Sequence, residues 1–146
     1  MKRISRSAIV QRSAQGVYAL VEDIEAYPAF LPHCLAAEVR ERSPGRTVAT
    51  LTFGIPGLTQ SFTTENLNSP GRAIDMRLLE GPFRHFRAGW RFTPLGEQAA
   101  KIEFSMEYEF SSPIVAKALA PVFGSLADSM VEAFSARAEK EARPED

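Results

Sequence analysis

The side chains that most often hold metals or transfer protons are few in this sequence. His33 and His85 are the only histidines, and Cys34 is the only cysteine. Neighbouring residues on a chain point their side chains in different directions, so His33 and Cys34 do not have the spacing of a metal site. His85 falls among the polar positions of an alternating segment, which favours a solvated side chain over a general base. We therefore expect no metal site and no catalytic histidine.

The acidic residues do not form a catalytic pair either. Glu103 and Glu107 occupy the polar positions of an alternating segment, and this placement is typical of a solvated strand face. Asp23 and Glu25 flank a turn between two short segments, where acids commonly lie near helix ends. The sequence contains no Gly-x-Ser-x-Gly, no glycine-rich phosphate loop and no His-Glu-x-x-His motif. Nothing in these patterns predicts an enzyme.

Length and composition indicate an ordinary globular domain. The chain has 146 residues, of which 45% are hydrophobic and 24% charged. We expect residues 1–142 to form a single domain and residues 143–146 to be a frayed tail. The formal net charge of −1 gives no global attraction to nucleic acid or anionic lipid. This argues against DNA as a partner and allows at most peripheral membrane contact.

Several features favour a cytoplasmic location. A lone cysteine cannot form an internal disulfide, which suits a reducing compartment. The apolar neighbours of Cys34 favour an inert core thiol over a reactive one. The N-terminus lacks the apolar stretch of a signal peptide, and no segment approaches the ~20 apolar residues of a membrane span.

Alternation of apolar and polar residues predicts strands that bury one face. In residues 101–110 the even positions are apolar and the odd ones polar, and residues 86–93 and 74–78 repeat this pattern. On the polar face, Arg87 and Arg91 can lie opposite the two glutamates of the last strand. Clusters of Gly and Pro separate segments of strand length, which predicts an antiparallel meander.

The ends of the chain have a different pattern. Residues 3–11 are expected to form a first strand, and Ser13 to cap a short helix that extends through Val21. A second short helix is expected around residues 27–32. In the C-terminal part, apolar residues recur every three or four positions, which predicts an amphipathic helix. Residues 122–142 of that helix would span ~31 Å, enough to cover the sheet. Pro121 predicts a kink, or a break after a short helix over residues 113–119.

The order of specific strings resembles a known family. They are Tyr-Pro-Ala-Phe-Leu-Pro-His-Cys at 27–34, Phe-Thr-Thr at 62–64, Gly-Pro-Phe at 81–83, Gly-Trp-Arg-Phe at 89–92, Ile-Glu-Phe at 102–104 and Met-Val-Glu-Ala-Phe-Ser-Ala-Arg-Ala at 130–138. Together they resemble the coenzyme Q-binding START-like family over nearly the whole chain. Its bacterial branch is also described as ribosome association toxin and, in older usage, as oligoketide cyclase.

This resemblance implies an α+β helix-grip fold. A curved seven-stranded antiparallel sheet would carry two short helices after its first strand and a long C-terminal helix over one face. The family implies a cavity that binds ubiquinone or a polyprenyl precursor without catalysis and so supports respiration, with no other cofactor. The toxin branch implies binding to the large ribosomal subunit and a block of subunit joining.

Parity along the strands and position on the helix give the candidate ligand-binding residues. Alternating aromatic side chains more often form a core than a ligand-binding wall at any one position, so the expectation rests on the whole set. The even residues of the last two strands are expected to face the C-terminal helix. The full set is Tyr27, Phe30, Phe62, Met76, Phe83, Phe86, Trp90, Phe92, Phe104, Met106, Tyr108, Phe123, Leu126 and Met130.

Three functions therefore remain open at this point. The favoured one is a carrier of an apolar quinone or isoprenoid lipid, because the interior is apolar and catalytic groups are missing. The second is a ribosome-binding inhibitor, which would need a basic surface patch formed by Arg84, His85, Arg87 and Arg91. The third is a polyketide cyclase-type enzyme, for which Tyr18 and Tyr108 would be the only acid or base candidates.

Overall fold

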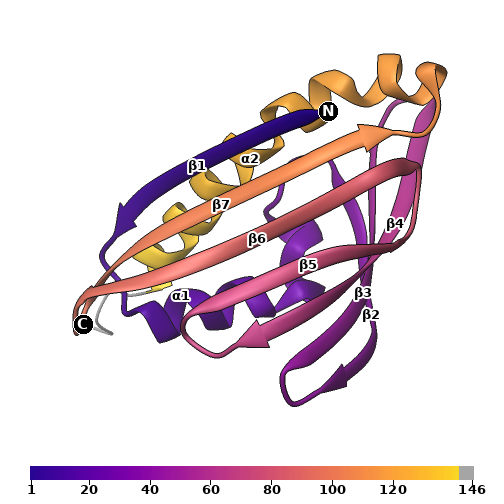
Figure 1. Ribbon diagram of the computed structural model, residues 1–146. Coiled ribbons are helices and arrows are strands. Elements are labelled where there is room, and N and C mark those ends of the chain that lie inside the picture. Colours follow the sequence, from indigo (N-terminus) through magenta and orange to yellow (C-terminus); the bar gives the residue numbers. More distant parts are fainter. Residues whose placement is uncertain (142–146) are drawn as a thin grey trace.

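The computed structural model describes residues 1–141 as one sheet with helices packed on its inner side (Figure 1). Seven strands and three helices follow one another along the chain. In order they are β1 (Lys2–Val10), α1 (Ala14–Glu22), the 3₁₀ helix η1 (Ile24–Ala29), β2 (Cys34–Ser43), β3 (Arg46–Ile55), β4 (Leu58–Ser69), β5 (Ala73–Glu80), β6 (Phe83–Gly96), β7 (Ala99–Phe110) and α2 (Pro113–Glu141). This confirms the predicted fold class. The predicted tail, residues 143–146, lies outside the described residues.

The strands form a single antiparallel sheet in the order β1-β7-β6-β5-β4-β3-β2. Strands β2 to β7 are a meander, and β1 joins its far edge beside β7. Gly45, Gly57, Gly71 and Gly81 have positive φ angles at four of the connections, as expected for glycines in tight turns. The sheet therefore curves continuously and presents one face to α2.

The predicted parity of the last two strands is confirmed. Phe86, Trp90, Phe104 and Tyr108 are all buried, and rings of this set contact Phe123 and Phe134 of α2. On the opposite face, Arg87 lies across from Glu107, and Arg91 lies across from Glu103, in the predicted register. The ion pairs, however, do not join the residues that lie opposite each other. Arg91 pairs with Asp75 at 2.9 Å, and Glu107 pairs with Arg3 and His85, each at 3.1 Å.

Helix α2 is continuous, so a break after a short helix over residues 113–119 is wrong, and the alternative, a kink at Pro121, stays a prediction. Proline has no backbone N–H, so the Lys117 carbonyl lacks its usual helical hydrogen bond. Pro121 and Lys117 both lie on the exposed side of the helix. Water can reach that carbonyl, and burial of Leu119 and Phe123 holds the two flanking turns on the sheet. By length and composition, Pro113–Lys140 would suffice to cross a membrane. Its apolar side packs on the sheet (Figure 1).

The two short helices cover the inner face near the C-terminal half of α2. Ser13 caps α1 as predicted, because its hydroxyl oxygen accepts a hydrogen bond from the Gly16 amide at 3.0 Å. The second helix, η1, begins and ends three residues before the predicted segment and contains Pro28. Pro28 has no N–H to donate to the Glu25 carbonyl, and η1 ends one residue later, at Ala29.

Candidate ligand-binding interior

The fourteen residues predicted to bind a ligand all lie on the inner side of the sheet or on the helices that cover it. Twelve of them are buried in the core, and Phe30 and Met76 are partly buried and packed against it. No ligand is present to test their role, so ligand binding by these residues stays a prediction. Their arrangement divides the interior into two ring clusters and the side chains between them.

The first cluster surrounds Phe123 of α2, and we call it the aromatic end. Five rings lie with their centroids 5.3–6.1 Å from the Phe123 ring: Phe53, Phe62, Phe83, Tyr108 and Phe110. Phe86 extends the cluster through Phe62 and Phe83. The sequence reasoning missed Phe53 and Phe110. The alternation of Leu51, Phe53 and Ile55 was an available signal for Phe53.

The second cluster surrounds Phe134, further along α2. Its ring centroid lies 5.3 Å from Tyr27, 5.1 Å from Phe30 and 5.5 Å from Trp90. Trp90 also contacts Phe104 at 4.9 Å and stacks on Phe92 at 5.9 Å. Here η1, β6 and β7 meet the C-terminal half of α2.

Flexible aliphatic side chains occupy the stretch between the two clusters. On α2, Leu126 and Met130 lie between Phe123 and Phe134, and on β7 Met106 lies between Phe104 and Tyr108. Methionine is unbranched and adapts its shape to its neighbours. This stretch can therefore change its packing at lower cost than the rings on either side.

A polar group of side chains lies on the inner face beside the second cluster, and we call it the polar end. It consists of Thr47 on β3, Thr64, Asn66 and Asn68 on β4, and the indole N–H of Trp90. The Thr64 hydroxyl donates to Asn66 Oδ1 at 2.8 Å, and Asn68 Nδ2 donates to Thr47 Oγ1 at 3.0 Å. The sequence reasoning missed these residues. A signal existed, because positions 64, 66 and 68 share the inward parity of Phe62.

Burial suppresses ionisation of the interior's titratable groups. Desolvation raises the pKa of Tyr27, Tyr18 and Tyr108 above the ordinary value for a phenol. The Tyr27 hydroxyl donates a hydrogen bond to the Val21 carbonyl. Burial likewise raises the pKa of the Cys34 thiol to about 11, as expected for an inert core thiol. A phenol with a raised pKa is a poor general base near neutral pH, which disfavours Tyr18 and Tyr108 in that role.

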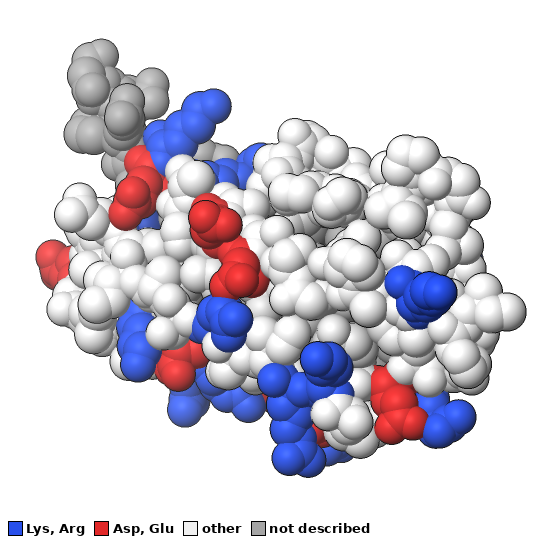
Figure 2. All heavy atoms as spheres, turned by 90° about the horizontal axis from the view of Figure 1, so that it is seen from above, with Lys and Arg blue, Asp and Glu red and all other residues white. Residues whose placement is uncertain are grey.

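An apolar groove reaches the aromatic end from the surface. It lies between β1, the end of β7 and the first half of α2, and its volume is about 440 Å³. Tyr108 and Phe110 line it from the sheet, and Ala116, Ala120 and Gly124 line it from the helix. Residues 110–127 contain one charged residue, Lys117. Figure 2 shows that the end of the molecule where α2 begins is largely free of charged side chains in this view.

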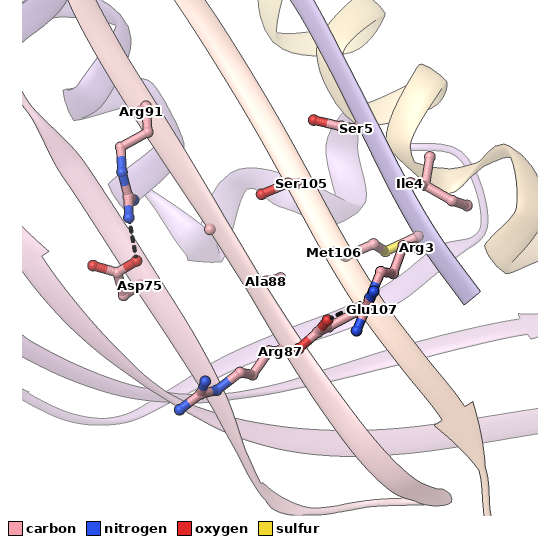
Figure 3. Close-up of a pocket in the computed structure, with 11 residues that line it drawn as sticks. Arg3, Ile4, Ser5, Asp75, Arg87, Ala88, Arg91, Ser105, Met106 and Glu107 are labelled. Carbon is pink, nitrogen blue, oxygen red and sulfur yellow. Dashed lines mark hydrogen bonds and ion pairs between the residues drawn. The ribbon is translucent and has the colours of Figure 1, made fainter. Parts of the chain in front are cut away.

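The outer face of the sheet carries a separate, polar hollow of about 360 Å³ (Figure 3). The small residues Ser5, Ser105 and Gly89 are aligned across β1, β7 and β6 and form its floor. Figure 3 shows the Arg91–Asp75 and Arg3–Glu107 ion pairs at its sides.

Most of the predicted basic patch is neutralised by neighbouring acids. Arg84 pairs with Glu109 at 2.7 Å, His85 with Glu107 at 3.1 Å and Arg91 with Asp75. Arg87 points away from the pairs drawn in Figure 3, and within residues 1–141 it has no carboxylate partner. Over the same residues, no group of three or more His, Cys, Asp and Glu side chains could hold a metal ion.

The chain is similar to known proteins of two kinds. It is 44% identical over 140 residues to the ribosome association toxin RatA of Vibrio cholerae serotype O1, covering 96% of this chain and 97% of the relative. It is 40% identical to RatA of Escherichia coli K12, covering 96% and 89%. It is 28% identical to the mitochondrial coenzyme Q-binding protein COQ10 homolog B of Xenopus laevis, covering 94% and 59%.

Solved structures agree with this fold. The Zhui aromatase/cyclase from Streptomyces sp. R1128 superposes with a TM-score of 0.85 at 19% identity, covering 98% of this chain and 96% of that one. The protein CC1736 from Caulobacter crescentus superposes with a TM-score of 0.74 at 30% identity, covering 97% and 98%. The model of the family described as polyketide cyclase / dehydrase and lipid transport matches residues 10–135. With this match over most of its length, the chain belongs to the polyketide cyclase / dehydrase and lipid transport family.

Proposed function

We propose that the protein binds an apolar, lipid-like molecule between the sheet and α2 and does not catalyse a reaction. The ligand class is ubiquinone or a polyprenyl precursor, and the role is to support quinone metabolism in the cytoplasm. The observation that carries this proposal is the interior itself. Two ring clusters are joined by adaptable side chains, Leu126, Met130 and Met106, and an apolar groove leads to one end.

The ligand would enter this interior by displacing flexible side chains. The rings around Phe123 contact one another closely, so they leave little free space at that end. Rotation of Met106, Met130 and Leu126 would open a channel along α2 without breaking a hydrogen bond. Each CH₂ of the ligand buried there contributes ~0.8 kcal/mol, which offsets the cost of repacking.

The ligand would enter the interior through the groove beside Tyr108. Its helical side is built from Ala116, Ala120 and Gly124, which leave room between α2 and β1. Tyr108 belongs both to this groove and to the aromatic end. A chain that slid past Tyr108 would reach the flexible middle of the interior directly.

The first test is binding of quinones that differ in chain length. Trp90 is the only tryptophan and is 1% exposed, so its emission reports on the interior. A long-chain quinone should quench it saturably, and a short-chain quinone should bind more weakly. Mass spectrometry of an organic extract of the purified protein identifies any lipid that is retained from the cell.

Two variants on adjacent residues separate specific binding from collision. Leu126→Arg places a charge in the interior and should abolish saturable quenching. Ser125→Arg makes the same change one residue earlier, on the exposed side of α2, and should leave it intact. Circular dichroism must show that both variants fold, because a buried unpaired charge can unfold a domain. Linear quenching that is identical in the wild type and both variants would refute the proposal.

A second candidate function is association with the large ribosomal subunit. The names of the relatives that are 40–44% identical support it. On the surface, the hollow of the outer sheet face offers Arg87, which has no carboxylate partner among the described residues. Because the neighbouring Arg3, Arg84 and Arg91 are paired with acids, this face is a weak anion site. The interior therefore remains the better supported site.

Co-sedimentation with large subunits at two salt concentrations tests this candidate. Contacts to phosphates release counterions, so binding through this face should fall steeply with salt. Arg87→Glu should weaken it further, and Arg40→Glu on β2, far along the sheet order, serves as the control. Absence of sedimentation even at low salt would exclude this function.

A further inference from the structure

The polar end is unusual because it lies in an otherwise apolar interior. Thr47 is 1% exposed, Thr64 5% and Asn66 6%, although all three have hydrogen-bonding side chains. A buried polar group is costly unless it finds a partner, so each donor and acceptor here should be accounted for. Two of them are not paired within the protein.

The unpaired atoms are one donor and one acceptor. Among residues 1–141, Trp90 Nε1 and Asn68 Oδ1 are buried without a hydrogen-bond partner in the protein. One N–H of the Asn68 amide donates to Thr47 Oγ1 at 3.0 Å. This bond fixes the orientation of the amide, whose Oδ1 is the buried atom without a partner. Trp90 is held by its stacking on Phe92 and its contacts with Phe104 and Phe134.

Both residues line the same small cavity. Its volume is about 10 Å³, and its other lining residues include Tyr27, Ile74 and Met76. A space of this size holds one oxygen-sized group. The Tyr27 hydroxyl does not fill this role, because it donates to the Val21 carbonyl. Glu22 also borders the cavity, but its carboxylate pairs with Arg42 at 3.2 Å.

The chemistry of the two free atoms selects one functional group. An occupant must accept a hydrogen bond from the indole N–H and donate one to the amide oxygen. A hydroxyl does both, whereas a carbonyl or ether oxygen can only accept and leaves Asn68 Oδ1 unpaired. The unpaired acceptor then keeps its desolvation penalty.

We propose that Trp90 Nε1 and Asn68 Oδ1 form the headgroup subsite of the interior, and that it recognises the hydroxyl of a phenol, hydroquinone or long-chain alcohol. This inference rests on the proposed function, because it assumes an apolar ligand in the same interior. Only the hydroxyl enters the small cavity, and the rest of the head lies beside Met76. The apolar chain runs along α2 past Met130 toward the aromatic end.

Matched probes test this assignment by calorimetric titration. 4-Decylphenol and 4-decylanisole have the same chain and ring, and only the phenol can donate to Asn68. The wild type should bind the phenol about tenfold more tightly, the equivalent of one hydrogen bond to a buried group. Asn68→Leu should remove most of this preference, whereas Trp90→Phe should weaken the binding of both probes and keep the preference, because both oxygens can accept from the indole N–H. Thr64→Val, whose hydroxyl lies outside the cavity lining, should keep it.

The outcomes separate this subsite from the proposed function. Equal binding of both probes by the wild type would overturn the subsite, mean that the cavity holds only water, and leave apolar-ligand binding standing. A preference that persists in Asn68→Leu would also overturn it. No binding of either probe would refute the proposed function and the subsite together. If Asn68→Leu does not fold by circular dichroism, Trp90→Phe decides the question: weaker binding of both probes supports the subsite, and unchanged binding overturns it.

Discussion

The two ends of the interior are held together in different ways. At the aromatic end, five rings surround Phe123, and no directional bond is needed to place them. At the polar end, Thr47, Asn66 and Asn68 are placed by specific hydrogen bonds. Burial of apolar area tolerates rearrangement, whereas a hydrogen bond fails when its partner moves. We therefore expect the aromatic end to supply most of the stability and, under the proposal above, the polar end to supply selectivity.

The largest expected effect is the loss of Phe123. Phe123→Ala removes the ring on which five others converge, and truncation of a buried phenylalanine costs about 3–5 kcal/mol of the free energy of unfolding. Trp90→Phe at the polar end keeps a ring in place and should cost clearly less. Urea denaturation of both variants measures the difference. Equal losses would contradict the division of roles between the two ends.

The next effect concerns the turn that places Phe83 at the aromatic end. Gly81 has φ +153°, and a Cβ there would lie 2.5 Å from Phe62 Cβ. Gly81→Ala therefore combines backbone strain with a clash and should cost about 2 kcal/mol, within the range for strained residues. Gly57→Ala is the matched control, because Gly57 also has positive φ (+89°) but nothing lies within 4 Å of its Cβ position. Similar losses of denaturation midpoint in both variants would show that contact with Phe62 is unimportant.

The aromatic end could be predicted from sequence far better than the polar end. Parity along a strand fixes which side chains face inward, so Phe86 and Tyr108 were placed correctly. Thr64, Asn66 and Asn68 share that parity, so their inward position could be predicted, but which of them form hydrogen bonds could not. The predicted break at Pro121 was wrong because a local rule ignored the packing of Leu119 and Phe123. The hydrogen bonds between β3 and β4 depend on how these two strands are aligned, and this alignment could not be predicted from the sequence.

A smaller effect is expected at the polar end. Thr47→Val keeps the shape of the side chain but removes the oxygen that accepts from Asn68 Nδ2. The unfolding free energy should fall by about 1 kcal/mol, the net value of a single hydrogen bond. The same variant should loosen the orientation of Asn68 and reduce the phenol preference. Unchanged stability together with an unchanged preference would mean that Thr47 does not hold Asn68.

The smallest effect is a pH dependence at the aromatic end, where Cys34 lies opposite Phe53 in the β2–β3 ladder. Burial raises the pKa of this thiol from 9.0 to about 11 in the folded protein. The folded state thus holds the proton more tightly than the unfolded chain. The resulting stability is fully present below pH 9 and is lost as the pH rises from 9 toward 11. Cys34→Ala should remove this part of the alkaline decline, so the stability lost on substitution should shrink as the pH rises from 9 toward 11. Urea denaturation of the wild type and the variant below pH 9 and near pH 11 measures this change. If the two proteins lose stability in parallel over this range, the thiol is not desolvated by the aromatic end, and its neighbours pack more loosely than the ring contacts around Phe123 indicate.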